Sequence, residues 1–286
     1  MIEVKKAQTL VQSRYRLNPI SLKLVTTLIS LVQKGDTPEQ EYCIKCIDFK
    51  KLAKMNGNGY HDLIKEACYE IMKKPIEIGT KGKKDYIVCN WASSCEYVEM
   101  EGLIKFQISP KLLPYVVELK ENYLKYELKN ILSLKSDYTI RIYEWLKDES
   151  NTKKRYGKHI STLDVPLEEL RKRLELPESY KFQHIKTQIL DKARTDIAKY
   201  CDIEFNWEVG DKIGKGVSSI KFQIAPNEQN TKQTIQLPQY IQGFMSYVGY
   251  LRELYKGSGT YFFIFNYDLG VGKNKYYFGI TYTFFT

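Results

Sequence analysis

The sequence predicts an α+β fold in which one plan, a group of helices followed by a strand hairpin with a basic turn, occurs twice. Helix caps precede apolar residues at helical spacing, alternating strand patterns follow, and the same order returns in the second half of the 286 residues. A chain of this length can form two domains of roughly 100 to 150 residues, each with its own hydrophobic core.

The first half opens with a capped helix. Asn18 and Pro19 form a cap followed by a first-turn proline, and apolar residues at helical spacing come next. A short strand is expected over 42–47. Asp48 is then expected to cap a small helix that ends at the glycines of residues 56–59.

A second helix, over 60–72, follows the glycine-rich turn, and two short helices across such a turn are typical of a helix-turn-helix. The basic turn TKGKKD, at 80–85, would form the wing of a winged helix. The core residues expected on the second helix are Leu63, Ile64, Ala67 and Ile71. The strands expected after it cover 75–78, 86–91, 94–98 and 103–108.

The second half repeats this order at low sequence similarity. Ser136 caps a helix, Val165-Pro166 opens a second one, and an amphipathic helix spans 182–199. Strands over 203–209 and 217–224 enclose the turn GDKIGKG. The patterns therefore predict two tandem winged-helix (winged helix-turn-helix) domains, followed by an extra aromatic C-terminal segment.

The balance of charge narrows the class of partner. Lys and Arg number 44 against 34 for Asp and Glu, so the formal net charge is +10 and the chain favours polyanions. Charge alone fits RNA, DNA or a membrane surface equally well. The first residues lack the apolar core of a signal peptide, and no stretch has the roughly 18 uncharged apolar residues of a spanning helix. We expect a cytoplasmic protein with no membrane partner.

The six cysteines are too sparse for a disulfide scaffold and are expected to stay reduced. Cys43 and Cys46 have a spacing that occurs in zinc sites, with Cys89 and Cys95 as a candidate second pair. Residues three apart on a strand face opposite sides, however, and the three histidines supply no zinc knuckle. The sequence therefore predicts neither a metal nor a cofactor.

The motifs of enzymes that act on DNA or nucleotides are missing. Rolling-circle nicking needs a metal held by a His-X-His pair, and the histidines at 61, 159 and 184 form none. The nearest phosphate loop, residues 270–274, lacks the earlier glycine and the Ser or Thr that must follow the lysine. The serine elbow of hydrolases is absent as well. We expect a binding protein and no catalytic residues.

Two segments resemble a known family. Residues 123–150 read YLKYELKNILSLKSDYTIRIYEWLKDES, and residues 167–205 read LEELRKRLELPESYKFQHIKTQILDKARTDIAKYCDIEF. The first looks like the signature of the Rep_3 initiator replication proteins of iteron plasmids, and the second matches that family's spacing of hydrophobic and basic positions. The resemblance runs from about residue 7 to 225, and nothing after Gln229 looks like the family.

The resemblance implies a function. Such a protein binds directly repeated sites (iterons) at a plasmid origin as a monomer and opens the duplex with host proteins, here expected to be the replication initiator ATPase and the replicative helicase. As a dimer it represses its own promoter. A winged-helix transcriptional repressor with no replication role shares these features, and an RNA-binding or structural module is a third class. Direct repeats beside the gene would favour initiation, and a lone inverted repeat would favour repression.

The helix over 182–199 is the expected base-reading element, because an α-helix fits the major groove. Its apolar arc holds Phe182, Ile185, Ile189, Leu190, Ala193 and Ile197, and Asp191 and Thr195 lie on the other arc. The candidate DNA-binding residues of the second domain are Lys181, Gln183, His184, Lys186, Thr187, Gln188, Arg194, Lys212 and Lys215. A solvated helix face fits the same pattern. The family often carries several arginines where this chain has Ile185 to Gln188, so no base preference is transferred.

The first domain offers a smaller set of candidates. They are Asn58, Tyr60, His61 and Lys65 at the start of its second helix, and Lys81, Lys83 and Lys84 on the wing. Lysines on a turn suit contacts with phosphates, although each one alone is also an ordinary surface charge.

The expected domain organisation has three parts. Residues 1–122 form the first winged helix, for dimerisation and DNA backbone contacts, and residues 123–226 form the second, for most of the sequence-specific binding. Residues 227–286 form a polar linker and an aromatic segment that packs on the body or mediates self-association. Charged residues interrupt the apolar run of that segment, which argues against membrane insertion.

Overall fold

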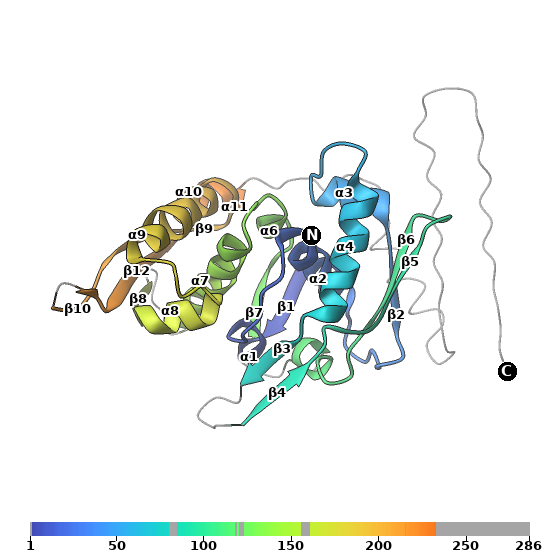
Figure 1. The fold of residues 1–286 in the computed structure, drawn as a ribbon, viewed down its shortest axis with the longest axis horizontal. Coiled ribbons are helices and arrows are strands. Elements are labelled where there is room, and N and C mark those ends of the chain that lie inside the picture. Colours follow the sequence, from blue (N-terminus) through green and yellow to red (C-terminus); the bar gives the residue numbers. More distant parts are fainter. Residues whose placement is uncertain are drawn as a thin grey trace.

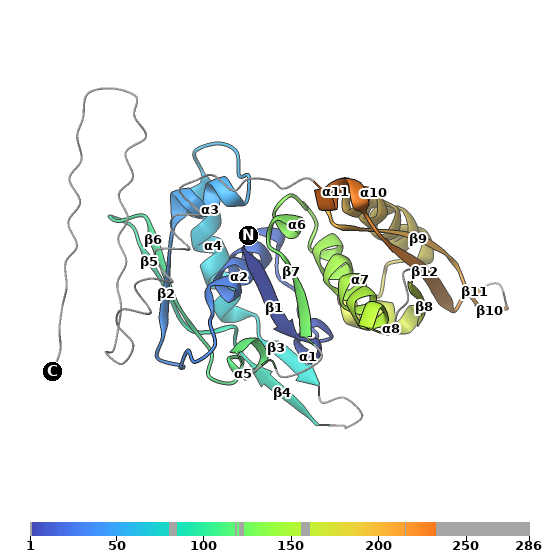
Figure 2. The same ribbon diagram turned by 180° about the vertical axis from the view of Figure 1, so that it is seen from behind.

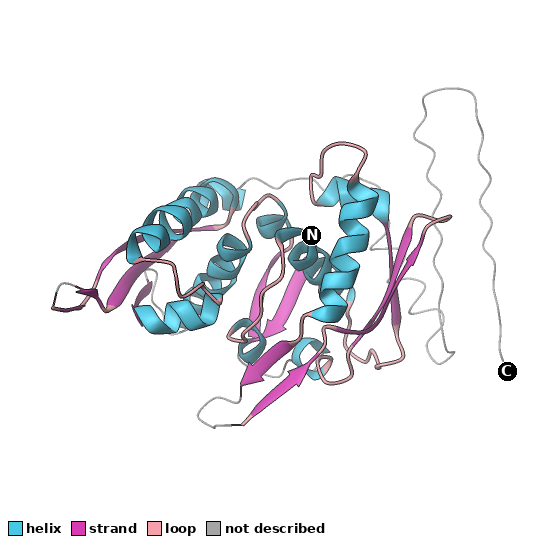
Figure 3. Ribbon diagram, in the orientation of Figure 1, coloured by secondary structure: helices cyan, strands magenta, loops and turns pink. Residues whose placement is uncertain are grey.

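The computed structural model describes residues 2–79, 85–117, 119, 123–155, 161–214 and 216–232. Half of the expected linker, residues 233–239, and all of the aromatic segment lie outside these residues. Figure 1 shows an elongated body with one three-stranded sheet toward each end and helix α7 with the β1–β7 strand pair between them. Figure 3 shows helices and strands in both halves, which confirms the α+β class.

The first half contains the elements of a winged helix in order. They are α2 (Pro19–Leu31), β2 (Glu41–Lys45), α3 (Cys46–Leu52), α4 (Tyr60–Lys73), β5 (Ala92–Val98) and β6 (Leu103–Ile108). The strands form an antiparallel sheet with the order β2-β6-β5, so the last strand inserts between the first two. This order of elements is that of a winged helix.

The second half has the same topology. Its elements are α7 (Asp137–Arg155), β8 (Ser161–Pro166), α8 (Leu167–Leu174), α9 (Phe182–His184), η1 (Ile185–Leu190), α10 (Asp191–Tyr200), β9 (Ile203–Val209) and β12 (Ser219–Pro226). The sheet order β8-β12-β9 again places the last strand in the middle. The repeat expected from the sequence is confirmed.

Further elements surround these two units. They are β1 (Glu3–Ala7), α1 (Gln8–Val11), β3 (Ile76–Gly79), β4 (Tyr86–Cys89), α5 (Pro114–Val117), β7 (Tyr123–Glu127), α6 (Lys129–Leu132), β10 (Lys212–Ile213), β11 (Gly216–Val217) and α11 (Glu228–Lys232). Strand β7 pairs with β1, so the segment expected to open the second domain is hydrogen-bonded to the start of the chain. The division at residue 122 stays a prediction.

A local sequence signal accounts for the start of α2. The Asn18 side chain accepts hydrogen bonds from the backbone N–H groups of Ile20 and Ser21, both at 2.9 Å, so the expected cap is confirmed. Asp48 is not a cap. Helix α3 begins at Cys46, and Asp48 lies in its first turn, where a carboxylate still favours the helix dipole.

The prediction that Leu63 of α4 is a core residue is wrong. The buried stripe consists of Ile64, Ala67, Cys68 and Ile71, which follow the i, i+3, i+4, i+7 spacing of one helix face. Leu63 precedes this stripe by one residue, which turns it about 100° away from Ile64. Its side chain is 40% exposed.

The expected wing of the first half is also wrong. Residues 80–85 lie between β3 and β4 in the chain, and these strands form a separate two-stranded sheet. The hairpin that belongs to the winged-helix sheet is β5–β6, which turns at Glu99–Gly102. Alternation along each strand indicates which side chains face the core but does not say which strands pair, and this explains the error.

Helix α7 packs on both halves and carries buried polar side chains. Lys6 on β1 and Glu144 on α7 form an ion pair of 2.6 Å, with only 2% of each side chain exposed. Lys6 also donates to the Thr26 hydroxyl on α2 (3.2 Å), and Tyr126 on β7 donates to Glu144. Burial raises the pKa of the Tyr126 hydroxyl, and the nearby Glu144 carboxylate raises it further. These contacts connect the first half to α7 through side chains that have few alternative partners.

Breaking this ion pair should destabilise the fold more than replacing it. We expect Lys6→Met to lower the free energy of unfolding by about 3–5 kcal/mol, because Glu144 is left as an uncompensated buried carboxylate. Lys6→Met with Glu144→Gln should recover more than half of that loss, since the amide oxygen still accepts from Tyr126 and no charge is buried. Urea unfolding monitored by circular dichroism measures both. Equal losses in the single and double variants would contradict this account.

Candidate nucleic-acid interface

The long helix of the second half has one buried and one exposed face. Ile185, Ile189, Leu190, Ala193 and Ile197 are buried and Phe182 is half-buried, as the sequence predicts. The candidate DNA-binding residues of this helix are all exposed: Lys181, Gln183, His184, Lys186, Thr187, Gln188 and Arg194. The structure thus brings these candidates together on one surface.

A π-helical turn, η1, lies in the middle of this surface. A π turn closes hydrogen bonds five residues apart, and such turns often occur at functional sites. Ile185, Ile189 and Leu190 of this turn are buried. The three residues between them, 186–188, are left exposed in a row. Apolar spacing in the sequence did not reveal this turn, because its buried residues also fit an α-helix.

The start of the helix is fixed by contacts that the sequence did not predict. The Arg171 guanidinium on α8 donates to the backbone carbonyl of Tyr180. The Tyr180 ring stacks on the His184 ring, with 5.7 Å between centroids. Thr187 donates its hydroxyl hydrogen to the Gln183 carbonyl (3.0 Å), so toward a ligand it presents its oxygen lone pairs and methyl group.

The surface of this helix is basic. Residues 181–199 carry five Lys or Arg side chains against two Asp side chains. Arg194 lies 3.7 Å from Asp191, which also accepts a hydrogen bond from the indole N–H of Trp207 (3.2 Å), so the charge of Arg194 is partly balanced. Lys212 is exposed on β10, in the hairpin that follows β9, whereas Lys215 lies outside the described residues.

The corresponding surface of the first half differs. Asn58 is exposed in the turn before α4, but the other helix candidates already have intramolecular partners. His61 Nδ1 is hydrogen-bonded to the Tyr97 hydroxyl, and Lys65 forms an ion pair of 3.1 Å with Glu99. The ammonium of Lys50 lies 4.4 Å from the centroid of the Tyr60 ring.

The wing lysines expected for this half, Lys81, Lys83 and Lys84, lie outside the described residues. Strand β3 follows the C-terminal end of α4 (Figure 1). The β5–β6 turn that takes the wing position carries Glu99, Glu101 and Met100, and the last is 97% exposed. Carboxylates at this position repel phosphates, so this turn is unsuited to the phosphate contacts expected of a basic wing.

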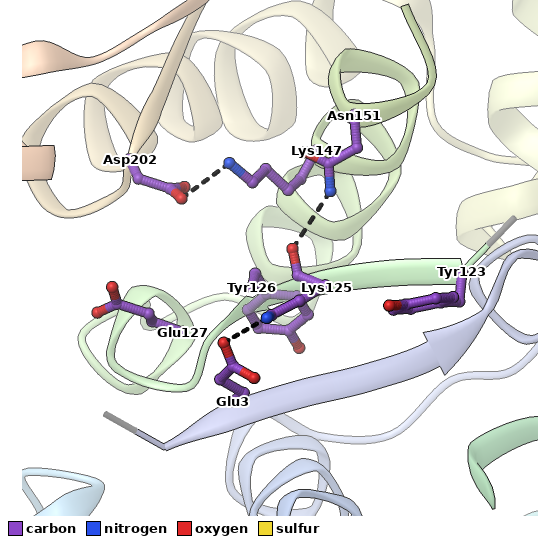
Figure 4. Close-up of a pocket in the computed structure, with 8 residues that line it drawn as sticks. All are labelled: Glu3, Tyr123, Lys125, Tyr126, Glu127, Lys147, Asn151 and Asp202. Atoms are coloured by element: carbon purple, nitrogen blue, oxygen red, sulfur yellow. Dashed lines mark hydrogen bonds and ion pairs between the residues drawn. The ribbon is translucent and has the colours of Figure 1, made fainter. Parts of the chain in front are cut away.

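A cleft of about 500 Å³ opens where α7 passes over the β1–β7 pair (Figure 4). Its charged side chains satisfy one another. Lys125 is paired with Glu3 at 2.6 Å, and Lys147 with Asp202 at 2.8 Å. Asn151 donates to the Lys125 carbonyl (3.2 Å). The cleft is lined by paired charges and does not resemble an anion-binding site.

The described residues contain no group of three or more His, Cys, Asp or Glu side chains arranged to hold a metal. Within the same residues, no helix is both long and apolar enough to cross a membrane. Cys43 lies on β2, whereas Cys46 begins α3.

The fold and this surface define a class: a tandem winged-helix protein with an exposed basic helix in its second unit. The family model described as Initiator Replication protein, WH1, matches residues 3–147, and the one described as Initiator Rep protein, WH2, matches residues 166–224. The chain belongs to the Rep_3 family of initiator replication proteins.

Individual relatives are more distant. A protein named Replication initiation protein from Escherichia coli is 24% identical over 231 residues, covering 79% of this chain and 70% of that protein. An uncharacterized 27.6 kDa protein from Escherichia coli is 24% identical over 233 residues, and the matched region covers 77% of this chain and 94% of that protein. The solved structure of the Pi initiator protein in complex with iteron DNA has a TM-score of 0.65 at 18% identity, covering 79% of this chain and 98% of that one. This likeness shows the fold.

The start of the second wing offers a matched test of the geometry. A Cβ at Gly210 would overlap Ser219 Oγ, which accepts a hydrogen bond from the Asp211 N–H (2.9 Å), whereas a Cβ at Gly216 meets only the Ile213 carbonyl at 3.5 Å. We expect Gly210→Ala to lower stability by about 1–3 kcal/mol and Gly216→Ala to change it by no more than about 0.5 kcal/mol. Thermal unfolding measures both, and equal melting temperatures for the two variants would refute the packing at Gly210.

Proposed function

We propose that this protein is a plasmid replication initiator that binds repeated origin sequences, the iterons, in double-stranded DNA and helps to open the origin. The observation that carries the proposal is the exposed basic surface of the helix over 182–200 in a chain of the initiator family. The likeness in fold to the Pi initiator, whose structure was solved with iteron DNA, supports it.

The helix would read bases from the major groove. Lysine donates to guanine O6 and N7, and glutamine pairs with adenine N6 and N7, so Lys186 and Gln188 beside the π turn are the proposed base-reading residues. Lysines at the helix start and on the wing, such as Lys181 and Lys212, would contact phosphates and supply affinity without sequence information.

The remaining parts of the proposal concern partners and regulation. The first half would mediate dimerisation and DNA backbone contacts, and the dimer would repress the protein's own promoter. The monomer would act with the host initiator ATPase and replicative helicase in the cytoplasm. Binding and remodelling of DNA would account for this activity without a catalytic step.

The experiment that tests this proposal is a salt-titrated binding assay on duplex DNA from the protein's own genetic neighbourhood. Scrambled duplex and single-stranded RNA are the competitors. Binding of a directly repeated sequence at least roughly a thousandfold tighter than the scramble is the expected result. Equal binding to all three, lost together as salt rises, would contradict the proposal. Specific binding to a single inverted repeat alone would indicate a transcriptional repressor.

Substitutions on the helix should separate specificity from affinity. We expect Lys186→Ala and Gln188→Ala each to cost about 1–3 kcal/mol on the specific site and much less on scrambled DNA. Lys212→Ala should weaken binding to both and lower the slope of log K against log salt by about one. The control is Lys199→Ala, an equal charge loss on an exposed residue at the far end of the same helix. If Lys199→Ala loses as much binding free energy on the specific site as Lys186→Ala does, the assignment of Lys186 as a base-reading residue is wrong.

A further inference from the structure

Three lysines lie where α2, the turn after α3 and the segment after α6 meet. Lys23 on α2 has only 7% of its surface exposed. Lys54, just beyond α3, donates from its ammonium to the Ser133 hydroxyl (2.9 Å), and Lys135 follows two residues later. None of these lysines belongs to the helix and wing surfaces described above.

Lys23 has a side chain that is largely buried, but its ammonium reaches the surface. Among the described residues, no ion pair or hydrogen bond is recorded for that ammonium. Burial, and then repulsion from Lys54 and Lys135, lowers the pKa of Lys23 to about 8. Like charges that lie close together repel one another, and a ligand of opposite charge would relieve that repulsion.

Lys54 adds a second, independent observation. Its φ is +53°, a left-handed conformation in which glycine is favoured and a side chain is strained. The Met55 N–H bonds to the Lys50 carbonyl (3.0 Å), the arrangement that ends many helices at a glycine. Strained residues of this kind persist at binding sites, where the side chain itself is needed.

The position of the cluster suits a DNA backbone. In Figures 1 and 2, α6, which leads to Ser133 and Lys135, lies between α3 of the first half and α10 of the second. The cluster therefore lies at the junction of the two halves. Ammonium and hydroxyl groups are donors typical of phosphate contacts.

We propose that Lys23, Lys54 and Lys135, together with Ser133, form a phosphate-binding site between the two winged helices that holds one backbone phosphate of the duplex. The identity of the ligand, a phosphate of the DNA backbone, rests on the proposed function. The site adds a contact that both halves share, because Lys23 and Lys54 come from the first unit and Lys135 precedes the first helix of the second.

Two variants test the site without weakening the fold. Lys23→Met keeps an unbranched apolar stem and removes a charge that two nearby lysines repel, and Lys54→Gly relieves the left-handed strain, so both should melt at or above the temperature of the parent protein. Each should weaken binding to specific duplex roughly tenfold and lower the salt slope by about one. Lys34→Met is the control, since Lys34 is exposed and its loss changes the net charge equally.

The phosphate can be located on the DNA. Duplexes carrying a single neutral methylphosphonate linkage at successive positions should reveal one position that weakens binding of the parent and of Lys34→Met but not of Lys23→Met. Titration with free ATP tests a nucleotide as the source of the phosphate. Nucleotide binding that is lost in Lys23→Met, while its affinity for DNA is unchanged, would overturn the assignment to the DNA backbone.

The outcomes separate this inference from the proposed function. If the parent protein shows no preference for repeated duplex DNA, the proposed function fails. If the parent binds specifically and the Lys23→Met and Lys54→Gly variants bind as tightly as Lys34→Met, the phosphate site alone is refuted.

Discussion

Helix α7 contacts both halves of the molecule, and the polar side chains on its buried face have specific partners. Glu144 pairs with Lys6 of β1 and accepts from Tyr126 of β7, while the Arg141 guanidinium donates to the carbonyls of Ser13 and Tyr15. Buried groups of this kind are costly unless all partners are in place, so few positions of α7 satisfy them. Because α7 is also the first helix of the second winged helix, its position sets where the second unit stands relative to the first.

The two winged helices share a topology but differ in charge. The second presents an exposed basic helix with a π turn, and Arg171 fixes the backbone where that helix begins. The first has carboxylates at its wing, and its His61 and Lys65 already have partners within the protein, Tyr97 and Glu99. The two units therefore differ in the charge of their exposed surfaces: the helix over 182–200 of the second unit is basic, whereas the β5–β6 turn of the first carries Glu99 and Glu101.

Much of the fold followed from local patterns. The Asn18 cap, the buried stripe of the long helix and the limits of β9 were predicted correctly, because caps and apolar periodicity depend on residues close in the chain. The wing of the first half was misplaced because strand pairing depends on residues far apart in the chain. Leu63 was expected to be buried, but it lies just beside the apolar stripe of α4. The exposed candidates on the long helix were found from sequence, whereas Arg171 was not, since its contact with Tyr180 arises only when α8 and that helix pack.

By itself, the sequence determined the α+β class, the repeated order of helices and strands, the basic character of the chain and the exposed arc of its longest amphipathic helix. These properties follow from composition and short-range spacing. The tertiary structure decided which hairpin joins each sheet, that Lys6 meets Glu144 across the chain, and that Lys54 and Lys135 lie near enough to Lys23 to repel its charge. The physical reason is that burial and pairing are set by which distant segments come together, and the energies of charged groups depend on those neighbours more than on the residues beside them in sequence.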